Sequence, residues 1–122
     1  MRDFPKITAP TFIEDPENAG AYEAKHTPHI EIEVVDDIAE ITVTAGYYVT
    51  HPNEAGHFFE WFMLYVEGQP ILHFVGAPEV LNPTVTVEVN LPAGTVIEAM
   101  AHCNLHGTWK AEATIPESNI VD

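Results

Sequence analysis

The residues best suited to chemistry in this sequence are its histidines and its cysteine. The chain has 7 histidines and 1 cysteine among 122 residues. Cys103 and His106 form a Cys-x-x-His motif, and His51 begins a polar stretch that ends at His57. One thiolate combined with several imidazoles suits a first-row transition metal such as iron, copper or zinc, and it does not suit magnesium or calcium. The spacing therefore predicts a transition-metal site.

Most of these residues, taken singly, also have an ordinary interpretation. A lone histidine in a β protein is usually a solvated surface group, and a lone cysteine is usually a small buried hydrophobe. We interpret His29, His73 and His102 as surface groups because none of them lies in a motif. His102 directly precedes Cys103 in an expected strand, so the two side chains should point to opposite faces.

The elements that must position these groups are β-strands. Alternating apolar and polar residues with frequent turn signals predict about seven strands and no helix. The expected strands cover residues 30–35, 40–45, 57–66, 70–75, 84–91, 95–103 and 108–115. The length of the segment 57–66 also leaves a helix open there. The histidine and cysteine motifs fall at strand–loop junctions, where side chains can converge while the sheets hold them rigid. We therefore predict an all-β protein, an immunoglobulin-like antiparallel β-sandwich.

The length of the chain fits one domain with a single core. Residues 1–28 contain four prolines and little periodic pattern, so we predict an irregular N-terminal arm. Residues 29–122 are predicted to form the sandwich. The single cysteine excludes an internal disulfide, and it excludes a second cysteine-held metal centre on this chain.

The charge balance limits the partners of the chain. It has 19 acidic residues against 4 lysines and arginines, for a formal net charge of −15. This excess argues against nucleic acid and against an acidic membrane surface as partners. No stretch approaches the roughly 18 apolar residues of a membrane helix, and the N-terminus has no apolar run typical of a secretory signal. We therefore expect a soluble, cytoplasmic protein.

Three blocks of sequence, taken in order, resemble a known family. They are Lys25-His26-Thr27-Pro28, then His51-Pro52-Asn53 with His57 and Glu60-Trp61, and then Cys103-Asn104-Leu105-His106-Gly107 with Trp109. This pattern resembles the superoxide reductases, the neelaredoxin and desulfoferrodoxin family. The resemblance implies an immunoglobulin-like β domain with one mononuclear non-haem iron, bound by four histidine nitrogens in a plane and one axial cysteine sulfur. By resemblance, the equatorial ligands are His26, His51, His57 and His106, and the axial ligand is Cys103.

The resemblance also implies an activity and partners. The expected reaction adds one electron and two protons to superoxide, giving hydrogen peroxide without dioxygen. Lys25 is expected beside the open sixth position of the iron, where it would attract superoxide. The implied electron donor is a rubredoxin-like protein, and the implied assembly is a homo-oligomer, a tetramer or a dimer. Because the chain lacks a four-cysteine domain, it resembles the one-iron, neelaredoxin type.

The sequence departs from the family pattern at one position before the first histidine ligand. Many members read Glu-Lys-His there, with a glutamate able to approach the ferric iron. In this chain Ala24 occupies that position and Glu23 lies one residue earlier. Either the ferric iron has no glutamate ligand, or Glu23 reaches it through a rearranged loop. Superoxide reduction is expected in both cases.

Residues flanking the motifs have expected roles as well. Trp61 and Trp109 are interpreted as core residues or as residues packed beside the metal. Asn104 and Gly107 are expected to shape the turn between the cysteine and histidine ligands.

Two other classes of protein fit part of the pattern. A cupredoxin-like electron carrier is also a β-sandwich with a late Cys-x-x-His motif. However, such carriers usually have a methionine soon after that histidine, and none follows His106 here. They also need only one further histidine, which would leave His51 or His57 idle. A plain immunoglobulin-like binding module would leave the whole histidine cluster unexplained.

Overall fold

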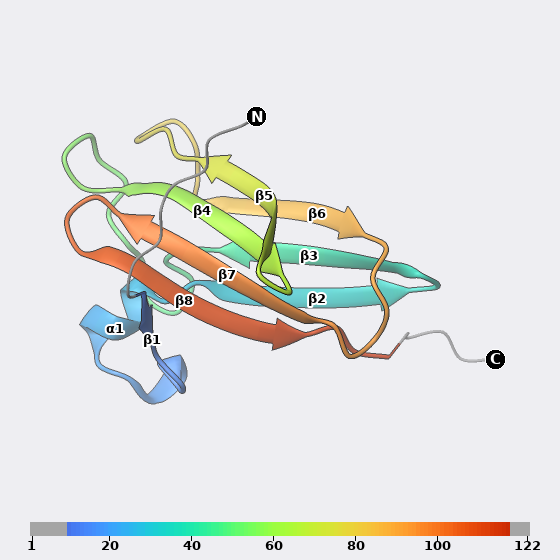
Figure 1. The fold of residues 1–122 in the computed structure, drawn as a ribbon. Helices are drawn as coiled ribbons and strands as arrows, with labels where there is room; N and C mark the ends of the chain where they lie inside the picture. The colour runs from blue at the N-terminus through green and yellow to red at the C-terminus, as the bar shows by residue number, and fades with distance from the viewer. Residues whose placement is uncertain (1–9, 118–122) are drawn as a thin grey trace.

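The structure is a computed structural model that describes residues 10–117 (Figure 1). Eight strands and two short helices follow one another along this part of the chain. In order they are β1 (Thr11–Phe12), the 3₁₀ helix η1 (Pro16–Asn18), α1 (Ala21–His26), β2 (His29–Val35), β3 (Ile38–Thr44), β4 (Phe59–Val66), β5 (Gln69–Val75), β6 (Thr84–Val89), β7 (Val96–Cys103) and β8 (Gly107–Thr114). Neither helix within residues 10–117 has the length and hydropathy of a membrane span.

The strands form two sheets that face each other (Figure 1). The larger sheet has the order β1-β8-β7-β4-β5, and the smaller has the order β2-β3-β6. Every named pairing is antiparallel except the parallel pairing of β1 with β8. The seven strands expected from the sequence correspond to β2 through β8. The prediction of an antiparallel β-sandwich is confirmed, and the segment that could have been a helix is the strand β4.

The core between the sheets follows from the alternation along the strands. In β3, in β7 and from Phe62 onward in β4, every second side chain is apolar and points inward, because successive side chains in a strand face opposite sides. The fully buried inward side chains include Ile41, Val43, Phe62, Leu64, Ile97 and Ala99. Cys103 belongs to the same inward row at the end of β7 and is 0% exposed. The core therefore extends to the end of the sandwich where the expected metal ligands lie.

The N-terminal segment contains a helix where the sequence indicated an irregular arm without one, so that prediction was wrong for α1. Alanine, glutamate and lysine favour a helix, and Glu23 in the first turn and Lys25 in the last turn suit the helix dipole. At the other end the Thr27 hydroxyl donates to the Glu23 carbonyl at 2.8 Å. Pro28 follows and prevents continuation. Six residues are too few to display a helical period, which is why the pattern was missed.

This helix decides where the first candidate ligand lies. His26 is its last residue and is fully buried. Glu23 belongs to the first turn, and a Cβ atom placed on Gly20 would lie 2.6 Å from its carboxylate oxygen Oε1. The Glu23 carboxylate therefore folds back over the beginning of α1, at the opposite end of the helix from His26.

Candidate metal centre

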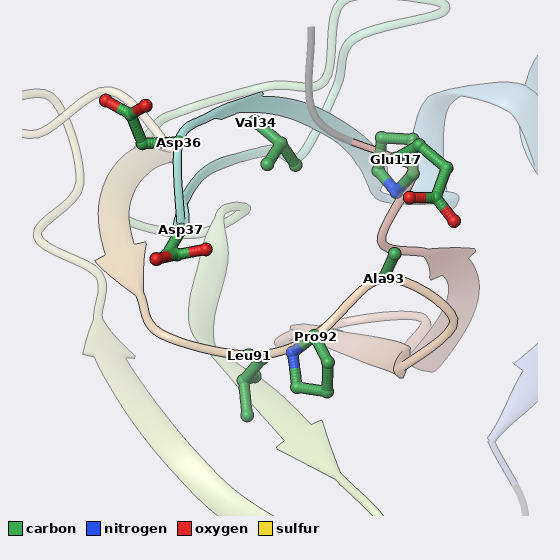
Figure 2. A pocket seen from close by; sticks show the side chains of 8 residues that line it. Val34, Asp36, Asp37, Leu91, Pro92, Ala93 and Glu117 are labelled. Atoms are coloured by element: carbon green, nitrogen blue, oxygen red, sulfur yellow. The ribbon is translucent and has the colours of Figure 1, made fainter. Parts of the chain in front are cut away.

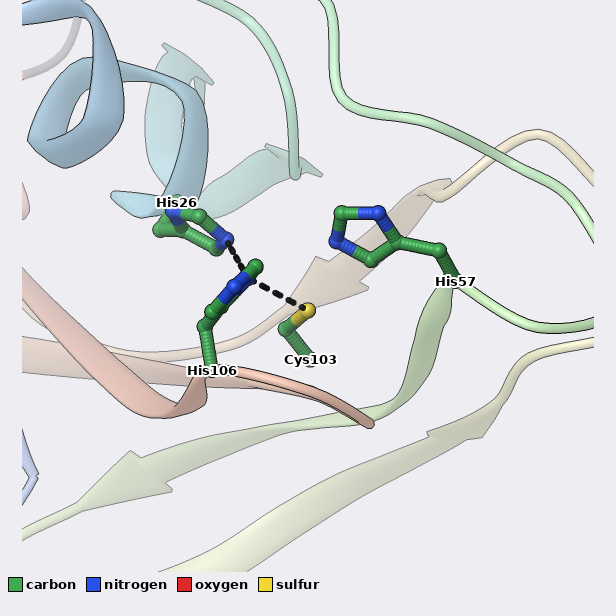
Figure 3. Close-up of side chains that lie close together, drawn as sticks. All are labelled: His26, His57, Cys103 and His106. Carbon is green, nitrogen blue, oxygen red and sulfur yellow. Dashed lines mark hydrogen bonds between the residues drawn. The ribbon is translucent and has the colours of Figure 1, made fainter.

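Four of the five predicted ligands gather at one end of the sandwich (Figure 3). His26, His57, Cys103 and His106 each offer one donor atom, and these atoms all lie within 4.8 Å of one another. Metal–donor distances of about 2.0 to 2.3 Å place donors on opposite sides of one ion roughly 4.0 to 4.6 Å apart. The spacing of the four atoms is thus close to what one shared ion requires.

The four donors come from separate parts of the chain. His26 ends α1, and His57 lies in the loop before β4. Cys103 is the last residue of β7, and His106 lies in the turn that leads to β8. The strand that ends in Cys103, β7, pairs with both β4 and β8. His57 lies just before β4 and His106 just before β8, so both histidines lie at the same end of the sheet as Cys103.

His51 lies beside this group without belonging to the set of four. The centroid of its ring is 4.7 Å from that of His57 and 4.9 Å from that of His26. Its ring also packs on Phe59 with a centroid distance of 4.2 Å. The structure therefore brings His51 to the edge of the cluster, buried between a core phenylalanine and two candidate ligands.

Hydrogen bonds orient two of the imidazole rings. Nδ1 of His26 lies 2.7 Å from the Tyr22 carbonyl oxygen, and Nδ1 of His51 lies 2.7 Å from the Pro52 carbonyl oxygen. A carbonyl oxygen only accepts, so both Nδ1 atoms carry the proton and donate it. Both Nε2 atoms then carry a lone pair, the form that binds a metal; that of His51 has no hydrogen-bond partner, and that of His26 faces Nδ1 of His106 at 3.1 Å.

The histidine of the Cys-x-x-His turn is oriented differently. Nδ1 of His106 lies 3.1 Å from Nε2 of His26 and 3.8 Å from Sγ of Cys103 (Figure 3). The inward atom of His106 is therefore Nδ1, whereas His26 and His51 have Nε2 available. The turn from Cys103 to His106 is short, and Nδ1, the ring nitrogen nearer to the main chain of His106, therefore points toward the sulfur of Cys103.

Unpartnered nitrogen atoms mark the same place. Among the described residues, Nε2 of His51 and Nε2 of His57 are buried and have no hydrogen-bond partner. Leaving a buried polar atom without a partner costs about 1 to 3 kcal/mol. A metal ion bound between the imidazoles would satisfy both atoms. The orphaned nitrogens, together with a buried thiol, fit a transition metal such as iron.

Burial favours the neutral form of three histidines at the site, His26, His51 and His57. Burial lowers the pKa of His51 to about 4, against the opposing hydrogen bond to Pro52. Burial likewise lowers the pKa of His26 and of His57 below the usual value. The positive charge of Lys25 lowers the pKa of all three histidines further. Neutral imidazoles are the form that can bind a metal at neutral pH.

Aromatic side chains hold the outer side of the site. Trp109 is buried and stacks on His26 with a centroid distance of 4.9 Å and an interplanar angle of 18°. Its indole Nε1 donates to the His106 carbonyl at 3.1 Å. Tyr22 packs edge-on against both His106 and Trp109. The expectation that Trp109 packs beside the metal site is confirmed. No motif in the sequence indicated that the Tyr22 ring and carbonyl oxygen would contact these residues.

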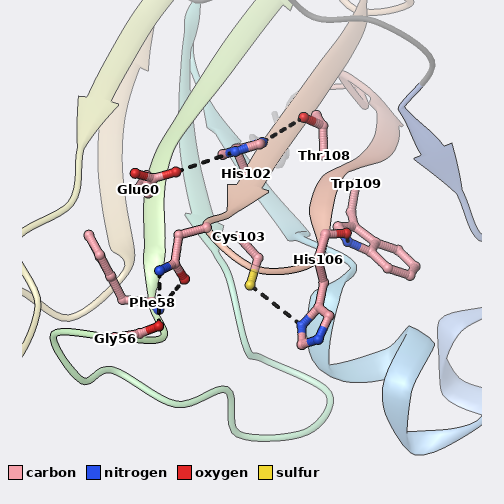
Figure 4. Close-up of polar contacts among 9 residues, drawn as sticks. Gly56, Phe58, Glu60, His102, Cys103, His106, Thr108 and Trp109 are labelled. Atoms are coloured by element: carbon pink, nitrogen blue, oxygen red, sulfur yellow. Dashed lines mark hydrogen bonds and ion pairs between the residues drawn. The ribbon is translucent and has the colours of Figure 1, made fainter.

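Trp61 and His102 lie on the other face of the large sheet. The two rings stack at 5.1 Å with an interplanar angle of 5°. His102 also contacts Glu60 at 3.3 Å and the Thr108 hydroxyl at 2.9 Å (Figure 4). The prediction that His102 and Cys103 point to opposite faces is confirmed. Trp61 is neither in the core nor beside the metal cluster, so that interpretation was wrong.

A surface hollow lies at the opposite end of the sandwich from the histidine cluster (Figure 2). Its volume is about 400 Å³, and its lining combines apolar residues with carboxylates of Asp36, Asp37 and Glu117. None of the candidate ligands lines it. The chemistry predicted from the sequence therefore belongs to the histidine end of the fold.

With this geometry in place, the comparison with known families assigns the chain to a family. Residues 18–112 match the family described as Desulfoferrodoxin. The chain belongs to the desulfoferrodoxin family. The matched segment includes α1, the strands β2 to β7 and all five predicted ligands.

Individual members of the desulfoferrodoxin family are similar over most of this chain. A putative superoxide reductase of Methanocaldococcus jannaschii is 34% identical over 101 residues, which cover 77% of this chain and 84% of that protein. Neelaredoxin of Megalodesulfovibrio gigas is 28% identical, covering 75% of this chain and 86% of the relative. The solved structure of a superoxide reductase (neelaredoxin) from Ignicoccus hospitalis has a TM-score of 0.72 and 30% identity, covering 88% of this chain and 94% of the other.

Proposed function

We propose that this chain is a superoxide reductase. It adds one electron and two protons to superoxide and releases hydrogen peroxide without producing dioxygen. The observation that carries the proposal is the convergence of His26, His57, Cys103 and His106 in a chain of the desulfoferrodoxin family. The names of the relatives and of the structural neighbours agree with it. The cupredoxin-like alternative finds no support among these relatives.

The family binds a mononuclear iron, and the donor set of this chain fits one. We infer that His26, His51 and His57 bind it through Nε2, His106 through Nδ1, and Cys103 through its sulfur. The unpartnered Nε2 atoms of His51 and His57, the lone pair on Nε2 of His26 and the inward Nδ1 atom of His106 support this assignment. When bound, the iron supplies the transferred electron by changing between its ferrous and ferric states.

The chain itself protects the sulfur ligand. Cys103 is 0% exposed and lies within the hydrophobic core cluster. Phe59, its register partner on β4, is also buried. Water and bulky oxidants are therefore kept from the thiolate, which remains available to a metal on the side of the histidines. The thiolate would donate electron density to the iron and favour transfer of the electron.

Lys25 is inferred to attract the substrate. Superoxide is an anion, and the chain carries a net charge of −15. At physiological salt, charges farther away than about 8 Å are largely screened, so the field near the site decides capture. Lys25 directly precedes His26, and its positive charge lowers the pKa of three candidate ligands. The same positive field draws superoxide to the site and can hold a water molecule that delivers a proton.

Glu23 is inferred to stay away from the iron. Its carboxylate lies over Gly20 at the beginning of α1, while His26 ends the helix. Ala24, at the position of the usual glutamate, is buried and has no polar side-chain atom. Of the two alternatives for the ferric site, this arrangement favours the one without a glutamate ligand.

The remaining inferences rest on the family resemblance or on the composition and pattern of the sequence alone. They are the rubredoxin-like electron donor, the homo-oligomeric state, the cytoplasmic location, and the division into an arm of residues 1–28 and a sandwich of residues 29–122. Each stays a prediction. A basic or apolar docking patch would be needed for an acidic donor, because the chain itself is strongly acidic.

The decisive experiment mixes the anaerobically reduced protein with superoxide and counts the products. A reductase forms peroxide and no dioxygen, whereas a dismutase forms both. Metal analysis of the same sample should give one iron per chain and a sulfur-to-iron absorption band after oxidation. An intense blue band from copper would support a cupredoxin-like carrier instead, and absence of metal would support a binding module.

A further inference from the structure

Two separate loops carry three of the candidate ligands at the end of the large sheet. His57 belongs to the loop before β4, and Cys103 and His106 border the turn after β7. The strands β4 and β7 are neighbours, and their ladder ends with the pair Phe59 and Cys103. His57 therefore lies two residues beyond the last pair, where the ladder no longer fixes it.

Asn104 bridges these two loops through its side chain and its backbone. Its Oδ1 accepts a hydrogen bond from the Phe58 backbone N–H at 3.0 Å. Its Nδ2 donates to the Gly56 carbonyl at 3.0 Å. Its backbone N–H donates to the Phe58 carbonyl at 3.1 Å. One residue thus makes three hydrogen bonds to the segment that carries His57.

The two side-chain bonds reach the peptide groups on both sides of His57. The Gly56 carbonyl belongs to the peptide bond that precedes His57, and the Phe58 N–H belongs to the peptide bond that follows it. Because Asn104 directly follows Cys103 in the chain, its amide fixes the backbone of His57 relative to the backbone of the cysteine.

The other restraints on His57 are local to its own loop. Its backbone N–H and carbonyl pair with the carbonyl and N–H of Glu54, at 2.9 and 3.0 Å. These bonds close a tight turn, and they do not tie that turn to Cys103. Packing beside Gly56 does not restrain the loop either, because a Cβ atom placed on Gly56 would meet nothing within 4 Å. Within residues 10–117, the side-chain hydrogen bonds that join the two ligand loops all involve Asn104.

We propose that Asn104 is a positioning residue that holds His57 at a fixed distance from Cys103. It thereby keeps the site preorganised for iron. The proposal rests on the ligand assignment made above, and it goes beyond a role of Asn104 in shaping its own turn. A site held by hydrogen bonds around its ligands retains metal better than one whose ligands must be gathered by the metal.

The test measures how fast a strong chelator removes iron from the reduced protein. Asn104→Ala removes both side-chain bonds, and we expect release about 10- to 100-fold faster than in the unaltered protein. Asn104→Asp keeps an acceptor for the Phe58 N–H and loses the donor to Gly56, so its release rate should be intermediate. The sulfur-to-iron band of the oxidised protein should shift in the same order.

Asn53 offers a matched control. Its amide also accepts from one backbone N–H, that of Glu79, and donates to one carbonyl, that of Leu81. It ties the histidine loop to residues 79–81 and makes no bond to the cysteine turn. Asn53→Ala should lower thermal stability as Asn104→Ala does, while its iron release and absorption band stay close to those of the unaltered protein.

Several results would overturn the proposal. Equal release rates in Asn104→Ala and the unaltered protein would do so, and so would equal acceleration in Asn53→Ala and Asn104→Ala. Failure of the unaltered chain to bind iron would overturn both this proposal and the proposed function. Stoichiometric iron binding without superoxide reduction would overturn the function alone, since the release rates would still test Asn104.

Discussion

The two regions that contribute candidate ligands differ in how firmly the fold holds them. Cys103 and His106 border a turn between paired strands, and Asn104 ties that turn to the loop of His57. Lys25 and His26, by contrast, lie on a helix of six residues that belongs to neither sheet. The first region is therefore part of the sandwich, and the second is attached to its end.

The second region is attached to the sandwich mainly through the aromatic rings around His26. Trp109 stacks on His26, and Tyr22 packs against Trp109 and His106. Farther along, β1 pairs with β8 over only two residues. From this difference we propose that the two regions have different roles. The sheet region would hold the metal, and the helix region would add one ligand, His26, and the positive charge of Lys25 that attracts the substrate. The predictions below test this division of roles.

The largest effect is expected in the sheet region. Cys103→Ser should abolish superoxide reduction, because a hydroxyl group or water cannot replace the electron donation of the thiolate. Stopped-flow mixing with superoxide measures the activity, and the sulfur-to-iron band should disappear from the oxidised spectrum. Full activity in this variant would show that the ligand assignment is wrong.

In the helix region, Lys25→Ala should slow the reaction and leave the iron in place. Local positive charge commonly raises the capture rate of an anion by about tenfold or more. We expect a second-order rate constant lower by roughly that factor, with a weaker dependence on ionic strength. Metal analysis provides the control. An unchanged rate with one iron still bound would remove Lys25 from the mechanism.

A smaller effect is expected where the helix ends. Thr27→Val removes the hydroxyl that donates to the Glu23 carbonyl and keeps a similar shape. We expect the free energy of unfolding to fall by about 1 kcal/mol, measured by urea denaturation. Iron release should accelerate less than in Asn104→Ala, because Thr27 supports only the helix region. A larger acceleration than that of Asn104→Ala would reverse the proposed division.

The smallest effect is expected for Glu23→Ala. Its carboxylate lies over Gly20, so removing it should leave the visible spectrum of the ferric protein unchanged at neutral pH. Superoxide reduction should also be unchanged. A shifted ferric spectrum would instead favour the alternative in which Glu23 reaches the iron after a rearrangement of the arm.

The strands were predictable from the sequence because their cause is local. Alternation such as that of Ile41 and Val43 with Thr42 and Thr44 requires only a sheet with one buried face. The five predicted ligands were recognisable because they lie in short motifs. The structure brings four of them together, and it places His51 beside the four.

The features that the sequence did not reveal depend on irregular backbone or on contacts between residues that are far apart in the sequence. The ladder between β4 and β7 shifts register between Phe59 and Trp61. The extra residue of such a bulge reverses the face of the next side chain, so Phe59 faces the core and Trp61 faces outward. Asn104 and Phe58 are 46 residues apart in sequence. Their contact could not be anticipated from the motif that contains Asn104.

The wide separation of the candidate ligands in the sequence has a consequence for folding. A chain with one cysteine cannot form an internal disulfide. An ion held by His26, His57 and Cys103 would nevertheless cross-link the beginning, middle and end of the fold. Covalent cross-links that close loops of this length restrict the unfolded chain by on the order of 4 kcal/mol in the entropic treatment. Bound iron would then act as a reversible cross-link, and its visible absorption would indicate whether the chain is folded.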